Sequence, residues 1–81
     1  MIQANIVELQ IDEVWQPSFI LIGPPEDFTA LVEKMADHDS GIIHHTRWHQ
    51  LRSPEEFVAY QEQGCQVRSK KWDEVESIDW G

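Results

Sequence analysis

The residues best suited to chemistry in this sequence are three closely spaced histidines. His44, His45 and His49 surround Arg47 and Trp48 in the segment GIIHHTRWHQL. Histidine titrates near neutral pH, so it can act as a general acid or base and can bind metal ions. The cluster therefore raises the alternative of a small histidine-dependent hydrolase or metal-binding protein.

The spacing of these histidines argues against a metal site. On a strand, alternate residues share a face, so His45, Arg47 and His49 lie on one side. At about 3.3 Å per residue, His45 and His49 are then about 13 Å apart, too far to bind one metal ion. On a helix they would be close enough, but the sequence has neither the H-E-x-x-H signature nor a Cys-x-x-Cys pair. We therefore predict a non-enzyme with no catalytic residue, no metal and no cofactor.

His44, His45 and Thr46 also match the H-x-T pattern of the two-histidine phosphoesterases. Those enzymes need two such motifs in a longer chain. The simpler interpretation is that alternate side chains of this strand face solvent or a partner. Since Arg and Trp are enriched at protein interfaces, we predict that Arg47 and Trp48 contact a partner.

The C-terminal segment WDEVESIDW combines aromatic and acidic side chains. A segment of this kind can occupy a basic groove on another protein, where its charges complement those of the groove. An alternative is a tail whose tryptophans pack on its own domain and whose carboxylates are solvated. We predict that the following residues bind a partner: Trp72, Asp73, Glu74, Glu76, Asp79 and Trp80.

The charge balance favours a protein partner over nucleic acid. The 81 residues carry 15 acidic and 6 basic side chains, for a net charge of −9. Nucleic-acid binding requires Lys and Arg at the phosphates, so we expect no direct nucleic-acid binding. The field of such a protein attracts a basic partner, although a merely solvated acidic surface has the same composition.

The remaining composition predicts a cytoplasmic protein. The single Cys65 excludes an internal disulfide and fits a reducing compartment. No apolar run approaches the length of about 20 residues that a membrane span needs, and the start of the chain lacks a signal-peptide pattern. We therefore expect no membrane association.

The strongest structural pattern is SFILIGPPEDFTALVEKM, from Ser18 to Met35. The apolar run FILI predicts a strand that is covered on both faces, and Gly-Pro-Pro ends it. Apolar residues at positions i, i+3, i+4 and i+7, beginning at Phe28, predict an amphipathic helix. The two prolines and the following Glu26 and Asp27 exclude a phosphate site at the start of this helix.

The flanking segments predict further elements. Residues 2–11 alternate in polarity and predict a strand with one exposed face, followed by a wide loop over 12–17. Residues 41–51 predict a third strand, which runs parallel to the FILI strand if the helix forms a crossover. Ser53-Pro54-Glu55-Glu56 predicts the start of a second helix, which ends at Gly64.

These patterns predict one compact α+β domain over residues 1–81. The expected order is ββαβα, with a mixed three- or four-stranded sheet and two helices on one face. Residues 65–81 predict either a fourth strand through Val67 and Trp72 or an extended acidic tail.

The span FILIGPPEDFTALVEKMADHDSGIIHHTRWHQL, residues 19–51, is similar to the strand, turn, helix and histidine-bearing strand of small bacterial immunity-type proteins, which neutralise polymorphic toxins. The resemblance covers 33 of the 81 residues and implies a non-enzymatic, tight-binding cytoplasmic partner of a toxin. The Gly-Pro-Pro turn and the C-terminal segment depart from that pattern, so no binding residue is carried over. Phage-encoded inhibitors of host defence complexes have the same size and acidity.

We therefore predict a small acidic protein-binding module that inhibits a basic protein, of the immunity or phage anti-defence kind. Two alternatives remain beside it. One is the histidine-dependent hydrolase or metal-binding protein described above. The other is an accessory domain that associates with itself, for example as a homodimer.

Overall fold

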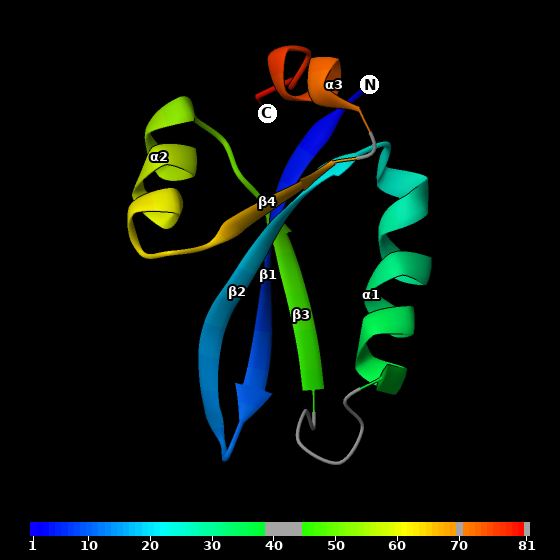
Figure 1. The fold of residues 1–81 in the computed structure, drawn as a ribbon, viewed down its shortest axis with the longest axis vertical. Coiled ribbons are helices and arrows are strands. Elements are labelled where there is room, and N and C mark those ends of the chain that lie inside the picture. Colours follow the sequence, from blue (N-terminus) through cyan, green and yellow to red (C-terminus); the bar gives the residue numbers. More distant parts are fainter. Residues whose placement is uncertain (39–44, 70, 81) are drawn as a thin grey trace.

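The computed structural model describes residues 1–38, 45–69 and 71–80, and a four-stranded mixed sheet forms its centre (Figure 1). The strands lie in the spatial order β3-β1-β2-β4. β1 is antiparallel to β2 and β3, and β4 is parallel to β2. The predicted α+β class and mixed sheet are confirmed. The strands are β1 (Gln3–Ile11), β2 (Val14–Gly23), β3 (His45–Gln50) and β4 (Gln66–Ser69).

Three helices and a short 3-10 turn complete the described part of the chain. The turn η1 (Pro25–Asp27) leads from β2 into α1 (Phe28–His38). α2 (Pro54–Glu62) connects β3 to β4, and α3 (Trp72–Glu76) follows β4. The predicted strand-turn-helix (β2, η1 and α1) and the predicted second helix (α2) are confirmed. The third helix, α3, was not predicted. None of the described helices is long and apolar enough to cross a membrane.

The helices lie on both faces of the sheet, so the expectation that they share one face is wrong (Figure 1). On one face, Phe28 and Val32 of α1 pack with Val7 and Phe19 of the sheet. On the other, α2 and α3 cover a cluster that includes the fully buried Ile20.

The strand order explains this arrangement. β2, β3 and β4 all run in the same direction, because β2 and β3 are each antiparallel to β1 and β4 is parallel to β2. The connection through α1 crosses the sheet towards β3, and the connection through α2 crosses back to β4. Right-handed crossovers in opposite directions place their helices on opposite faces. The predicted parallel orientation of the FILI strand and the third strand is confirmed, although β1 lies between them.

A two-residue turn joins β1 to β2, so the predicted wide loop is wrong. Asp12 and Glu13 form this turn with positive φ angles of 50° and 68°, and β2 begins at Val14. The loop over residues 12–17 was expected because Pro17 lacks the backbone N–H that donates a hydrogen bond in a sheet. The sheet accommodates it because β4 first pairs with β2 at Phe19, beyond this position.

The first half of β1 is buried on both faces, which corrects the prediction of one exposed face. Ala4 and Ile6 lie in the cluster under α2 and α3, whereas Val7 packs under α1. This burial follows from the place of β1 inside the sheet, between β3 and β2. The polar alternation that suggested exposure begins only at Glu8, which is half-buried.

The start of α2 is the one predicted from Ser53-Pro54. The Ser53 hydroxyl accepts a hydrogen bond from the backbone N–H of Glu56 at 3.3 Å, as an N-cap requires. The Glu56 carboxylate in turn accepts from the N–H of Arg52 at 3.3 Å. Gly64 follows the helix with a φ of 96°, a conformation that glycine adopts without strain.

Candidate protein-binding surface

The predicted contact residues fall in two separate regions of the structure. Arg47 and Trp48 belong to β3, whereas the other six lie in or after α3, near the N-terminus of the chain (Figure 1). Arg47 and Trp48 themselves point to opposite faces, because Arg47 is opposite Glu8 and Trp48 is opposite Val7 on β1. The structure therefore does not unite the two regions into one surface.

Arg47 interacts with its own domain. Its Nε atom lies 3.2 Å from Oε1 of Glu8, and its guanidinium stacks 4.1 Å from the centre of the Trp15 ring. The side chain is still 52% exposed, so the ion pair is at the surface. A partner that used Arg47 would have to compete with both of these contacts.

The histidines of β3 lie beside this ion pair. His45 and His49 share the face of Arg47, as predicted from strand alternation, and His49 Nδ1 lies 4.0 Å from Glu8 Oε1. His44 lies outside the described residues. Over the described ranges, no group of three or more His, Cys, Asp or Glu side chains could hold a metal ion.

The C-terminal segment folds onto the domain through a short helix. The Ser69 hydroxyl, at the end of β4, lies 2.6 Å from Glu74 Oε2 and 2.7 Å from the Lys71 carbonyl oxygen, and its proton can be donated to either. The Ser77 hydroxyl donates to the Asp73 carbonyl at 3.1 Å. These bonds fix both ends of α3 and direct Glu74 inward.

The residues after α3 are docked as well. Ile78 forms a parallel bridge with Ile2, and the Asp79 N–H donates to the Ile2 carbonyl at 2.7 Å. The Trp80 ring packs edge-on against Phe57 of α2, with ring centres 5.9 Å apart. The alternative of tryptophans that pack on their own domain therefore describes Trp80.

Trp72 is different, because its side chain is 82% exposed. It forms one wall of a groove of about 490 Å³ between α2, β4 and α3. Glu76 follows four residues later and so lies on the same side of the helix as Trp72, and Asp73 is exposed beside it. The groove is lined by Phe57, Gln61, Cys65, Gln66, Val67, Trp72 and Val75.

Cys65, which lines this groove, and Tyr60 of α2 are poor nucleophiles at neutral pH. Burial raises the pKa of the Cys65 thiol above its ordinary value of 9.0. Burial, followed by the charges of Glu8, Glu56 and Cys65, raises the pKa of Tyr60 above 10.0. Both groups are therefore protonated at neutral pH, the form in which neither is a good nucleophile.

The sequence did not reveal the groove. Composition identifies Trp72 and its acidic neighbours, but the apolar walls come from α2 (Pro54–Glu62) and from β4 (Gln66–Ser69), which directly precedes α3. The sequence does contain two apolar residues of the groove, Phe57 and Val67. They could have been assigned to one groove only if β4 had been known to lie close to α2.

No family model, no curated protein and no solved structure matches this chain at a significant level.

Proposed function

We propose that this protein is a small acidic binding module that inhibits a basic protein by covering part of its surface. The observation that carries the proposal is the 82% exposure of Trp72 on the rim of an apolar groove. Tryptophan, with tyrosine and arginine, is enriched among the interface residues that dominate binding energy. A large aromatic side chain in this position gives a partner apolar area to cover.

The side chains around Trp72 favour a basic residue of the partner protein as the group that binds there. The aliphatic stem of a partner's Arg or Lys would lie along the apolar groove walls, with its charge over the Trp72 ring. Glu76 and Asp73 would then lie close to that charge and complement it. The net charge of −9 would speed the encounter with a basic protein.

The inhibitor role follows from the same features together with size. An acidic chain of 81 residues that covers a basic surface would block any substrate or nucleic acid which that surface binds. Immunity-type proteins and phage anti-defence inhibitors act in this way. Arg47 and Trp48 are left out of the proposed surface, because one is paired with Glu8 and the other faces the side of α1.

The test is an affinity capture from a lysate of the source cells, at low and then high salt, with bound proteins identified by mass spectrometry. The wild-type protein is compared with Trp72→Ala and with the double variant Asp73→Lys, Glu76→Lys. The matched control is Glu13→Lys with Glu33→Lys, two exposed acids outside α3. Both double variants change the net charge from −9 to −5, since each Glu or Asp to Lys substitution adds two units.

We expect one basic protein that is released by salt, is retained by the control variant and is lost from the other two. Equal loss from both double variants would show that the overall field, and not the α3 surface, drives binding. Recovery of the protein alone, with a sedimentation coefficient that rises with concentration, would replace the proposal with self-association.

A further inference from the structure

β4 lies at one edge of the sheet, and no described strand pairs with its outer side. The outer side of an edge strand can pair with another extended chain. Because successive side chains of a strand point to opposite faces, a chain added at β4 would place its side chains alternately on the two faces of the sheet. What borders β4 on each face therefore determines which side chains fit.

On the face covered by α2 and α3, β4 borders the groove beside Trp72 (the Trp72 groove). Val67 of β4 packs against the cluster on this face, and it lines the groove together with Phe57 of α2. Asp73 and Glu76 are exposed on α3. A side chain with an aliphatic stem and a positive charge at its end is suited to apolar walls beside carboxylates.

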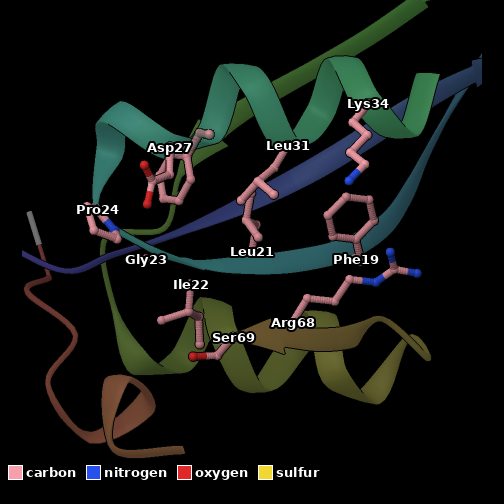
Figure 2. Close-up of a pocket in the computed structure, with 11 residues that line it drawn as sticks. Phe19, Leu21, Ile22, Gly23, Pro24, Asp27, Leu31, Lys34, Arg68 and Ser69 are labelled. Carbon is pink, nitrogen blue, oxygen red and sulfur yellow. The ribbon is translucent and has the colours of Figure 1, made fainter. Parts of the chain in front are cut away.

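On the face covered by α1, β4 borders a second cavity (the α1 cavity). It has a volume of about 270 Å³ and lies over β2, between α1 and β4 (Figure 2). Phe19 and Leu21 of β2 line it, as does Leu31 of α1. Arg68 borders it on the side of β4, with its guanidinium stacked 4.5 Å from the centre of the Phe19 ring. This lining favours an apolar side chain.

The other edge strand, β3, lacks this arrangement. No described residue of β3 lines the Trp72 groove or the α1 cavity. β4 is therefore the edge that has an apolar recess on each face.

We infer that the basic partner binds through an extended segment that adds to β4 as a further strand and alternates basic with apolar residues. The inference rests on the proposed function, because it specifies how that partner occupies the Trp72 groove. The basic side chains would enter this groove, attracted by Asp73, Glu76 and the net charge of −9. The apolar side chains between them would cover the α1 cavity. An added strand lies about 4.8 Å from β4, so the long side chains of Arg and Leu can reach both recesses.

The probe is the peptide acetyl-Arg-Leu-Arg-Leu-Arg-amide, which spans the four residues of β4 and has the required alternation. The control peptide acetyl-Arg-Arg-Leu-Leu-Arg-amide has the same composition and charge without the alternation. Chemical shifts and hydrogen exchange of the amides are measured on the labelled full-length protein with each peptide at up to about 1 mM, the range of weak binding. We expect the alternating peptide to give saturable shifts and slower exchange in β4, and the control peptide to bind at least about tenfold more weakly.

N-methylated peptides separate backbone pairing from side-chain docking. Successive residues of a strand direct their N–H groups to opposite edges, so only one alternate set can donate to β4. One form of the alternating peptide is N-methylated at both leucines, and the other at the first and third residues. We expect one form to keep its Kd within about threefold and the other to lose at least about tenfold, because its hydrogen bonds to β4 are removed.

Substitutions in the protein test the two recesses separately. Trp72→Ala should raise the Kd of the alternating peptide by about tenfold, and Leu31→Ala should raise it by about fivefold through lost apolar contact. The matched control is Val58→Ala, an exposed apolar residue of α2 that lines neither recess and should leave the Kd unchanged. The peptide comparisons use the wild-type protein, so they remain decisive if Leu31→Ala does not fold.

Three results would overturn the inference: no saturable shifts, equal binding of the control peptide, and an equal effect of the two N-methylation patterns. Loss of binding in Trp72→Ala with equal binding of both N-methylated forms would leave the proposed α3 surface in place and exclude strand addition. Unchanged binding in Trp72→Ala, with slower exchange in β4, would instead support strand addition and contradict the proposed α3 surface.

Discussion

The Glu74 carboxylate lies 2.6 Å from the Ser69 hydroxyl, and this contact holds the first turn of α3 against the end of β4. With Glu74 turned inward, Trp72 at the start of the same helix remains exposed on the rim of the groove. Trp80, after the helix, packs on Phe57. Glu74 and Trp80 therefore hold the segment on the domain, whereas Trp72 remains available at the surface.

Removal of that contact should loosen the segment without unfolding the domain. We expect Ser69→Ala to lower the free energy of unfolding by about 1.5 kcal/mol, the lower end of the range for a hydrogen bond to a charged group, because the site is only part-buried. Amide exchange of residues 72–80 should accelerate more than that of β1 and β2. Ser77→Ala, which removes an exposed bond in the same segment, is the control, and exchange no faster in Ser69→Ala than in Ser77→Ala would contradict the anchoring role.

The Glu8–Arg47 pair should contribute little to stability. Because Arg47 is 52% exposed, a double-mutant cycle with Glu8→Gln and Arg47→Gln should give a coupling energy of about 0.5 kcal/mol. Urea unfolding of the four proteins measures it. A coupling energy several times larger would mean that the pair and its Trp15 neighbour form a strongly cooperative unit.

The hairpin turn between β1 and β2 should be improved by glycine. Glu13 has a φ of 68°, in the left-handed region that is unfavourable for residues with a side chain, and a two-residue turn of this kind prefers glycine at its second position. Glu13→Gly should raise the free energy of unfolding by about 0.5–1 kcal/mol in urea titrations. Glu13→Ala keeps the side-chain penalty and should show no such gain. A destabilised Glu13→Gly protein would indicate that the Glu13 side chain makes a stabilising interaction.

Stability should fall at alkaline pH through Cys65 and Tyr60. Folding raises both pKa values above 9.0 and 10.0, so the folded protein holds these protons more tightly than the unfolded chain. Their contribution is complete below pH 9 and is lost as pH rises from the unfolded pKa values through the raised folded ones. Thermal unfolding of wild type and Cys65→Ala between about pH 7 and pH 11 measures the difference. The substitution should make the decline shallower, and identical slopes would show that Cys65 does not take part.

Local patterns account for the elements that were predicted correctly. The apolar spacing of α1 and the Ser53 cap of α2 act within a few residues, so both could be recognised from the sequence. The five-residue α3 begins at Trp72, and Lys71 before it makes no side-chain cap, so the helix has no start signal and is too short to show a helical period. Its formation depends on Ser69 and on packing against β4, which no local pattern contains.

The relations between distant residues explain the remaining errors. The loop predicted at Pro17 is wrong because a proline is tolerated in β2 where β4 does not pair with it, and the sequence does not show where β4 begins. The side of the sheet that each helix covers depends on the strand order, which the sequence does not state. In the same way, composition identified both Trp72 and Trp80 as contact residues, but only the bridge between Ile78 and Ile2 shows that the chain folds back and directs Trp80 inward.

The most direct test of the proposed function is a calorimetric titration of the captured basic partner with two tryptophan variants. Trp72 is 82% exposed beside α2, and Trp48 is 37% exposed on the opposite face, so each substitution removes the same side chain from a different surface. We expect Trp72→Ala to raise the Kd by about 30-fold, which corresponds to a dominant contact of about 2 kcal/mol, and Trp48→Ala to leave it within about twofold. An unchanged Kd for Trp72→Ala, or a greater loss with Trp48→Ala, would contradict the assignment of the α3 surface as the binding site.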